Sequence, residues 1–544
     1  MKYTIIGSGV SGVNAALTLL ERGKSVVMYD VGKEEEEFPF PALDFYRLKD
    51  NIDLPHDYFL GRNAEAIIPP CDKRGFVFPP ARNFSIYDND PLCTISKGST
   101  FRPILSHNSG GLGVAWGANA IEFNAAELSV MGLSNNDFFE PYDILSKRIS
   151  IAGPDMDALS GDLKTSITFS RPLKLNLHEK LLLKSANTKK NFADSSLHLG
   201  HSRLAVESRA GKANECIYCA RCMWGCAVGA IYNPITTLKK CLDYKEFKYI
   251  KNSVVLSLIS EQNKVVALKL YDTKKKTYST VNCDKVLLAA GAINSAAIFL
   301  RTLNQDSRYN SNLNNYSHST KSLLDTSVLK LPYIYPKMIG RKMNLDTMQF
   351  NKLIIGYVRR NFKSELDRYI HGEVVTLSSL LYHPIIEELP FSTNVNFNLF
   401  KYLKNAIGVV TYFLPDHCAD TNYMTLKENN NSVSKDEIYL GYNESAEQII
   451  LKKELSKVTK RYFKQLGCYM PSKSHISSEV GGGIHYAGTI PYSKVENKLC
   501  TNKNGRCYSY NNLYVVDGAV LPALPSKSIT LNLMANSIRI ATKI

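Results

Sequence analysis

Apolar and polar positions at the start of the chain predict a strand, a helix and a second strand. Residues 3–6 (YTII) form a short apolar run, and residues 13–23 (VNAALTLLERG) carry apolar side chains at helical spacing. Residues 25–30 (SVVMYD) form a second apolar run that ends in an acid. The stretch GSGVSG (7–12) separates the first strand from the helix, so the pattern predicts a βαβ unit.

The glycines of this stretch have the spacing G-x-G-x-x-G, which is typical of dinucleotide binding when it joins a strand to a helix. The first glycine makes the tight turn, the second lets the backbone approach a pyrophosphate, and the third lets the helix pack on the strand. Asp30 stands where an acid accepts hydrogen bonds from ribose hydroxyls and disfavours a 2′-phosphate. The predicted ligand is FAD or NAD, and its predicted contacts here are Gly7, Gly9, Val10, Ser11, Gly12 and Asp30.

Two later segments also predict a buried strand, a small-residue turn and a helix. Residues 283–300 (CDKVLLAAGAINSAAIFL) have this order, and LYVVD (513–517) is followed by Gly518, a proline-rich loop and a helical pattern over 530–541. The chain of 544 residues has a single G-x-G-x-x-G motif, and distant segments complete the nucleotide-binding domain that this motif begins. This arrangement favours FAD over NAD.

Five segments in chain order resemble the glucose–methanol–choline (GMC) oxidoreductases, FAD enzymes that oxidise alcohols. The resemblance spans nearly the whole chain and is weakest through roughly 305–475. Its segments are GSGVSG with Asp30, SGGLGVAWGANAIEF (109–123), SNNDFFEPYDILSKRISIAG (134–153), KVLLAAGAINSAAIFL (285–300), and HYAGTIP (485–491) with NLYVVDGAVLPALPSKSITLNLMANSIRIA (512–541).

The resemblance implies an α/β fold in which a Rossmann-like FAD-binding domain is interleaved with an α+β substrate domain on an antiparallel sheet. The expected boundaries are 1–125, 206–302 and 479–544 for the FAD-binding domain, and 126–205 and 303–478 for the cap segment and substrate domain. The resemblance further implies that the cofactor is contacted by Gly111, Gly117, Asn119, Ala290, Asp517, Gly518 and Thr530.

His485 is the predicted catalytic base. It lies in a glycine-framed loop, and an imidazole suits the acceptance of a hydroxyl proton while a hydride leaves the carbon. The family usually has a second His or Asn before the last helix, and matching on T-x-N-x-M-A places Ser528 there. A serine can orient a substrate oxygen but is no strong base at neutral pH. Either Ser528 orients the substrate, or another residue supplies the partner, or the chemistry has changed. Lys527 beside it either favours an anionic substrate or points to solvent.

Four cysteines, Cys216, Cys219, Cys222 and Cys226, have the spacing C-x2-C-x2-C-x3-C of bacterial ferredoxin ligands. We interpret them as ligands of a [4Fe-4S] cluster, or of a [3Fe-4S] cluster if only three bind. Thiolates also suit zinc, although structural zinc sites usually pair two cysteines with two more distant ligands. The third alternative is a cysteine-rich segment without metal, since several GMC relatives carry similar segments and not all are known as iron–sulfur proteins.

Charge and composition limit the classes of partner. The net charge is +16, while 44% of residues are hydrophobic and 21% charged, as in ordinary globular proteins. The lysines are scattered and no nucleic-acid-binding signature appears, so we expect no nucleic-acid partner. The sequence shows neither a membrane span nor a basic leader before the first strand. We expect a cytoplasmic protein, with contact to an anionic membrane face left open by the basic charge.

The sequence therefore predicts an FAD-dependent dehydrogenase that oxidises a CH–OH group of a sugar, sugar derivative or other alcohol. Electrons are expected to leave through the cysteine segment to a protein or quinone-type acceptor. Two alternatives stay open: a flavin-dependent reductase or isomerase on the same scaffold, and an FAD-binding electron-transfer protein without substrate turnover.

Overall fold

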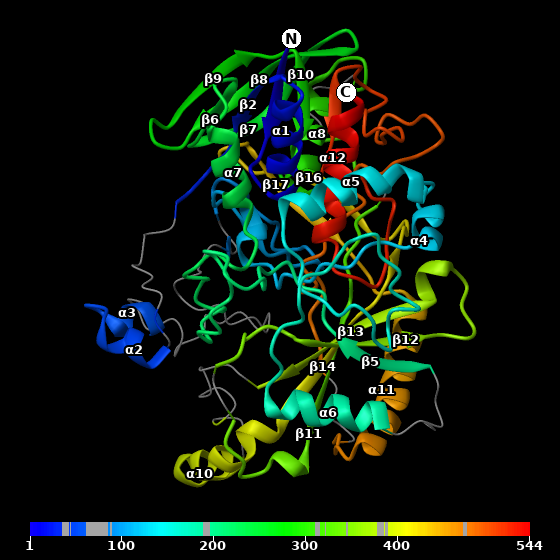
Figure 1. Ribbon diagram of the computed structural model, residues 1–544. Coiled ribbons are helices and arrows are strands. Elements are labelled where there is room, and N and C mark those ends of the chain that lie inside the picture. The colour runs from blue at the N-terminus through cyan, green and yellow to red at the C-terminus, as the bar shows by residue number, and fades with distance from the viewer. Residues whose placement is uncertain are drawn as a thin grey trace.

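The architecture was analysed in a computed structural model of the chain (Figure 1). The structure describes residues 1–34, 43, 45–60, 85–86, 90–188, 196–310, 316–320, 322–343, 346–377, 386, 390–471 and 476–544.

A five-stranded sheet carries the nucleotide half of the molecule. Its strand order is β19-β10-β1-β2-β6, and the registered pairs between neighbours are parallel. Both faces are covered, so the strands are short runs of apolar residues, as buried parallel strands usually are. The strands are β1 (Lys2–Ile6), β2 (Ser25–Tyr29), β6 (Phe247–Ile250), β10 (Lys285–Leu288) and β19 (Leu513–Val515).

Helices pack on both faces of this sheet. Alternate residues of β1 and β2 enter two different cores, because side chains of a strand point to opposite faces. One core holds side chains of α1, α7 and α12, and the other holds side chains of α8 and of the sheet β7-β8-β9. Figure 1 shows both termini at this end of the molecule. The bounds are α1 (Val10–Glu21), α7 (Pro234–Leu242), α8 (Ala292–Gln305), α12 (Thr530–Lys543), β7 (Ser253–Glu261), β8 (Lys264–Asp272) and β9 (Thr277–Asn282).

A six-stranded antiparallel sheet forms the other half, in the order β18-β11-β14-β13-β12-β5. One of its faces packs against α6 and α11 in a separate hydrophobic core. The opposite face of β13 turns toward the nucleotide half, as its side-chain contacts below show. The bounds are β5 (Leu197–His201), β11 (Val328–Ile334), β12 (Leu353–Val358), β13 (Tyr369–Thr376), β14 (Ile407–Phe413), β18 (Ile476–Ser477), α6 (Leu177–Thr188) and α11 (Ala446–Leu466).

Smaller elements connect the two halves or lie at the periphery. They are α2 (Phe45–Asp50), α3 (Pro55–Leu60), α4 (Ala125–Val130), α5 (Asn135–Arg148), α10 (Thr393–Leu403), β3 (Ser85–Ile86), β4 (Leu105–Ser106), β15 (Asp416–His417), β16 (Tyr423–Glu428), β17 (Asp436–Gly441) and β20 (Ala523–Leu524), with 3-10 turns η2 (Gly111–Ala115), η3 (Pro336–Met338), η4 (Glu365–Asp367), η5 (Lys404–Ala406) and η6 (Gly518–Val520).

The predicted fold class is confirmed, because a parallel sheet with helices on both faces is joined to an antiparallel sheet. Segments from three distant parts of the chain build the parallel sheet, as the predicted interleaving requires. The domain boundaries themselves stay predictions. Within the described residues, no helix is long and apolar enough to cross a membrane.

Candidate active site and cysteine segment

The glycine turn after β1 is closely packed. Gly7 has a positive φ of 100°, and a Cβ added there would lie 2.6 Å from the Ala289 carbonyl oxygen. A Cβ on Gly12 would lie 2.0 Å from the Gly7 carbonyl oxygen, so α1 approaches β1 more closely than a side chain permits. A Cβ on Gly9 would lie 4.0 Å from its nearest neighbour, the Ala289 carbonyl oxygen. The space in front of the α1 N-terminus is therefore open at this position. Only glycine fits the first and third positions, as a phosphate-binding turn requires.

The first turn of α1 offers an unused hydroxyl. Ser11 is buried and its Oγ has no hydrogen-bond partner in the described structure. The helix N-terminus adds backbone amides and the positive end of the helix dipole at the same place. Val10, the first residue of α1, contacts η2, because a Cβ on Gly113 would meet its Cγ1 at 2.5 Å. These groups fit an anionic ligand such as a pyrophosphate.

Asp30 ends β2 within a hydrogen-bonded network. Its Oδ2 accepts from the Ser8 hydroxyl and, at 2.8 Å, from the Tyr249 hydroxyl. Ser8 Oγ in turn accepts from the Gly110 amide at 2.8 Å, which ties the glycine-rich loop to the nucleotide turn. Burial raises the pKa of Asp30 despite these donors. The predicted ribose acceptor therefore stands beside both glycine segments.

The glycine-rich loop lies over the nucleotide turn. A Cβ on Gly111 would lie 3.6 Å from Gly9 Cα, while Gly117 is exposed and faces open space. Asn119 is buried, and its Oδ1 lacks a hydrogen-bond partner in the described structure. An unsatisfied buried acceptor is costly unless a ligand completes it, so Asn119 fits a bound group.

Asp517 closes the third of the segments that are predicted to contact the cofactor. Its Oδ2 accepts from the Gly291 amide at 2.9 Å and from the Ser295 hydroxyl at 2.6 Å, and its Oδ1 accepts from the Ala519 amide at 3.0 Å. Ser295 Oγ also accepts from the Ala290 amide at 3.0 Å. Burial raises the pKa of Asp517 to about 6. The carboxylate thus joins the ends of β10 and β19.

His485 lies in a loop held to the end of β19. The Gly488 amide donates to the Gly518 carbonyl at 3.1 Å, and a Cβ on Gly518 would meet the Tyr486 carbonyl oxygen at 2.5 Å. The Asp325 carboxylate accepts from the amides of Gly483 and His485, each at 3.1 Å. These contacts fix the loop from both sides.

The imidazole of His485 is neutral at pH 7 and lies beside a hydroxyl group and an aromatic ring. Its Nδ1 lies 2.8 Å from Thr326 Oγ1, and its ring lies 5.3 Å from that of Phe413 between centroids. Burial lowers the pKa of His485 to about 4, so the imidazole is neutral at pH 7. If Thr326 donates to Nδ1, the tautomer carries its proton on Nε2; if Thr326 accepts, Nε2 is the free base.

Two further titratable residues, His371 and Glu373 of β13, were missed from the sequence. Asn119 Nδ2 lies 2.6 Å from Glu373 Oε1 and 3.2 Å from His371 Nε2. The ring of Phe413 stacks on His371 at 6.3 Å and also contacts His485, so it lies beside both imidazoles. Burial raises the pKa of Glu373 to about 7 and lowers that of His371 to about 3. Their only sequence signal is a pair of polar residues two apart on one face of a strand whose other residues are mainly apolar.

Lys527, just before the last helix, was expected to favour an anionic substrate or to point to solvent, and it does not point to solvent. This lysine forms a fully buried ion pair with Glu127 (Nζ to Oε2 2.7 Å). Ser528 is buried, and its backbone carbonyl accepts from Asn532 Nδ2 at 3.3 Å. Thr530 is the half-buried first residue of α12. No recorded contact among the described residues joins Ser528 to His485.

Non-glycine residues with positive φ adjoin the candidate residues. Ala118 (61°) precedes Asn119, Ile484 (59°) precedes His485, and Tyr218 (55°) and Ala220 (54°) flank Cys219. A left-handed conformation is unfavourable for residues with a Cβ, above all for a β-branched isoleucine. Such conformations persist where surrounding contacts enforce them, often at functional sites.

The four clustered cysteines line one cavity of about 20 Å³, together with residues such as Val228 and Met348. The Ala230 amide donates to Cys226 Sγ at 3.1 Å, and the Gln349 amide donates to Cys222 Sγ at 3.4 Å. Burial raises the pKa of Cys216 to about 11 and that of Cys222 to about 12. In the described part of the chain, no three His, Cys, Asp or Glu side chains converge closely enough to hold a single metal ion.

Arg221 lies within this segment and is completely buried. Its Nε, Nη1 and Nη2 atoms all lack a hydrogen-bond partner in the described structure. A buried guanidinium without a partner is strongly unfavourable, since its charge is neither solvated nor paired. The segment therefore fits an additional anionic group.

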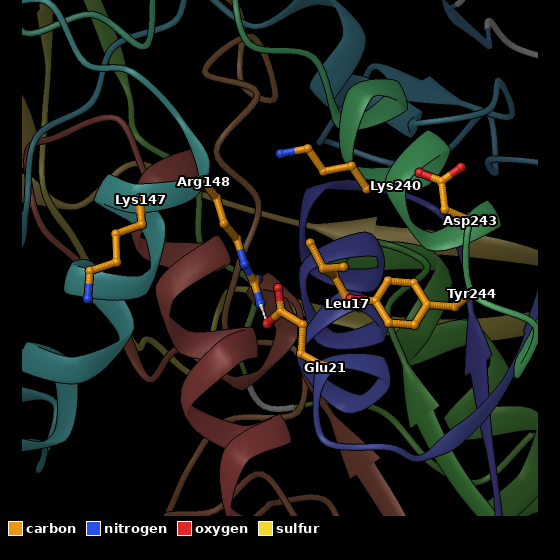
Figure 2. A pocket seen from close by; sticks show the side chains of 7 residues that line it. All are labelled: Leu17, Glu21, Lys147, Arg148, Lys240, Asp243 and Tyr244. Atoms are coloured by element: carbon orange, nitrogen blue, oxygen red, sulfur yellow. Dashed lines mark hydrogen bonds and ion pairs between the residues drawn. The ribbon is translucent and has the colours of Figure 1, made fainter.

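A surface pocket of about 640 Å³ lies elsewhere, between α1, α5 and α7 (Figure 2). Arg148 pairs with Glu21 at 2.5 Å in this pocket. None of the predicted site residues lines it, and we assign it no role. Its lining residues are Leu17, Glu21, Lys147, Arg148, Lys240, Asp243 and Tyr244.

Comparison with known proteins finds a family model that is similar to the C-terminal part of the chain. A family model described as GMC oxidoreductase matches residues 420–537, which include His485, Asp517, Gly518, Ser528 and Thr530. No curated protein matches the chain.

Solved structures share the fold at low sequence identity. Pyridoxine 4-oxidase from Mesorbium loti has a TM-score of 0.59 and 14% identity, with 100% of this chain and 98% of that chain covered. An FAD-dependent oxidoreductase from Chaetomium thermophilum, solved with a bound fragment, has a TM-score of 0.58 and 12% identity, with 99% and 98% covered. Residues 420–537 are thus similar to the GMC oxidoreductase family model, and the chain shares its fold with these two structures.

Proposed function

We propose that the chain is an FAD-dependent GMC-type oxidoreductase that oxidises a CH–OH group of an alcohol, with a sugar or sugar derivative as the leading substrate class. The observation that carries the proposal is the neutral imidazole of His485, held by Asp325 and Thr326 within the segment matched to GMC oxidoreductases. A neutral imidazole can take the hydroxyl proton of an alcohol as its carbon loses a hydride.

The nucleotide turn, the glycine-rich loop and the Asp517 segment would hold FAD. Their fit rests on the unpartnered Ser11 hydroxyl, the unpartnered Asn119 oxygen and the open position at Gly9. FAD supplies, when bound, the acceptor for two electrons and a proton equivalent. We expect Asp30 to bind the ribose and the α1 N-terminus to bind the pyrophosphate.

Proton handling on the substrate side is assigned to two groups. His485 accepts the hydroxyl proton, and Glu373 of β13, held by the amide of Asn119, positions a second substrate hydroxyl. We assign to Glu373 the role that the family pattern gives to a His or Asn at the position of Ser528. The carboxyl group of Glu373 suits a polyol such as a sugar, because a protonated carboxyl group can both donate hydrogen bonds to hydroxyls and accept them.

We further propose that Cys216, Cys219, Cys222 and Cys226 hold an iron–sulfur cluster. The proposal is supported by their ferredoxin spacing, C-x2-C-x2-C-x3-C, and by the four thiols lining one common cavity. The unpaired cation of Arg221 would balance the negative charge of such a cluster. A cluster supplies a one-electron carrier, which favours a protein or quinone-type acceptor over oxygen.

The test is anaerobic purification followed by absorption spectroscopy and iron, sulfide and zinc analysis. Bleaching of the flavin bands on adding an alcohol or sugar would support the oxidoreductase. The His485→Asn variant should retain FAD and no longer show this bleaching. Failure to bleach across a broad panel would favour a reductase, an isomerase or a non-catalytic flavoprotein.

The cluster is tested in the same preparations by its iron and sulfide. Cys219→Ser should remove both, and Cys468→Ser, a buried cysteine outside the segment, should retain them. Zinc without iron, or no metal at all, would contradict the cluster and leave the flavin proposal standing.

A further inference from the structure

The end of the molecule that carries α10 has an unusual surface. Figure 1 shows α10 projecting at the end opposite the two termini. The Gly340 amide donates to the Tyr402 carbonyl at 3.0 Å, and Asn405 Nδ2 donates to the Arg341 carbonyl at 2.7 Å, so the segment after η3 packs beside α10. We define the α10 tip as residues 336–343 and 390–406.

The tip exposes large apolar side chains. Helix α10 buries Asn396 and Phe400 against the protein. Val395, Leu399 and Tyr402, spaced i, i+4 and i+7, form a second stripe on the helix, and each is more than a third exposed. Exposed apolar side chains at the same tip also include Ile339, Phe391 and Phe397. Exposed apolar side chains that are grouped on one projecting element indicate an interaction surface, whereas single exposed apolar side chains spread over a protein do not.

The tip is also basic. Residues 336–343 and 390–406 contain no Asp or Glu, and Lys337, Arg341, Lys342 and Lys401 are exposed there. The chain as a whole carries a net charge of +16. Exposed apolar side chains with exposed cations on the same tip suit the surface of an anionic bilayer, where acyl chains lie beneath negative headgroups.

We propose that the α10 tip is a peripheral membrane-binding surface for bilayers that contain anionic lipid. Phe391, Leu399 and Tyr402 enter the boundary between headgroups and acyl chains, and the cations contact the lipid phosphates. A second copy of the chain is a poorer occupant, because pairing this tip with itself would oppose like charges. This inference is independent of the proposed catalytic activity.

The experiment is co-sedimentation of the full chain with neutral phosphatidylcholine vesicles and with vesicles containing 30% phosphatidylglycerol. We expect binding to the anionic vesicles that weakens as salt is raised, and much weaker binding to neutral ones. Arg341→Glu with Lys342→Glu should lower the binding constant at least ten-fold, since each cation near such a surface contributes about five-fold. Leu399→Ser with Tyr402→Ser should lower it by a similar factor.

Matched controls separate this surface from general charge and exposure. Lys274→Glu with Lys275→Glu, in the exposed β8–β9 turn, removes the same charge, and Phe139→Ser removes another exposed aromatic side chain. Both controls should bind vesicles like wild type. Equal loss in the controls, or no vesicle binding by wild type, would overturn the proposal. A dimer in light scattering that the Leu399 and Tyr402 substitutions dissociate would also overturn it, by assigning the surface to a second copy.

Discussion

At the residue scale, the candidate site depends on how burial changes the pKa of a few side chains. Burial keeps His485 neutral and Glu373 largely protonated below pH 7. The same loss of solvation therefore favours the neutral imidazole at one position and an uncharged hydrogen-bonding acid at the other.

We expect His485→Asn to lower kcat by 10² to 10⁴, because it removes the proton acceptor and keeps a polar side chain. In wild type, kcat/KM should rise with pH through an apparent pKa well below 6.5 and stay flat toward neutrality, since only the neutral imidazole accepts the proton. Initial rates measured from pH 4.5 to 8 check both points. His56→Asn, at an exposed histidine of α3, should leave both unchanged.

Glu373→Gln and Ser528→Ala distinguish the two candidates for the second substrate contact. We expect Glu373→Gln to raise KM about ten-fold or more, because the carboxyl beside Asn119 is lost. Ser528→Ala should change KM less than three-fold, since the recorded contact of Ser528 uses its backbone. The reverse order of effects would restore Ser528 as the functional partner.

The nucleotide residues could be predicted because their chemistry is local. Gly7, Gly12 and Asp30 act through a turn whose spacing is visible in twelve to thirty residues of sequence. His371 and Glu373 could not, because only the pairing of β13 in the antiparallel sheet brings them beside Asn119, more than 250 positions earlier. The roles assigned to all of these residues stay predictions.

At the scale of elements, α1 packs so closely on β1 that it has no room for a methyl group at Gly12. A Cβ at position 12 would meet the Gly7 carbonyl oxygen at 2.0 Å, and neither backbone segment can move without shifting β1 or α1.

We therefore expect Gly12→Ala to destabilise the protein by about 1–3 kcal/mol, the usual cost of overpacking, and to abolish FAD retention. Flavin content after gel filtration and urea unfolding followed by circular dichroism measure the two effects. Gly161→Ala, where an added Cβ meets nothing within 4 Å, should leave both within error.

Strands of the nucleotide half follow the sequence patterns closely. The runs at 3–6, 25–29 and 513–515 become β1, β2 and β19, because buried parallel strands are short and almost wholly apolar. The antiparallel half is harder to predict. Its strands alternate buried and half-buried residues, as β14 does, and their order is set by contacts between segments far apart.

At the scale of the whole molecule, stability should depend on pH through the buried carboxyl groups. Burial raises the pKa of Asp325, Asp416 and Glu373 above their values in an unfolded chain, so the native state holds protons that the unfolded state releases. His371 and His485 have lowered pKa values and oppose this trend while the unfolded chain releases its histidine protons, which occurs around pH 6.5 and is largely complete by about pH 7.5.

The free energy of unfolding of the FAD-free protein should therefore fall between pH 6.5 and 8, by on the order of 1 kcal/mol for each such carboxyl group. Urea unfolding at the two pH values measures the difference. Glu373→Gln should reduce it, and a stability that rises over this window would contradict the assignment.

The arrangement of the parallel sheet has a consequence for synthesis on the ribosome. Strand β1 pairs with β10 near residue 286, and β10 pairs with β19 near residue 514. At roughly 5–20 residues per second, about 25 to 100 seconds separate the emergence of β2 from that of β19. The apolar faces of β1 and α1 lack the cover of α12 throughout that interval, and one edge of β10 has no neighbour for about 11 to 45 seconds after β10 itself has emerged. We expect the nascent chain to be a client of chaperones that hold unfinished sheets, and to aggregate when synthesis stops before residue 513.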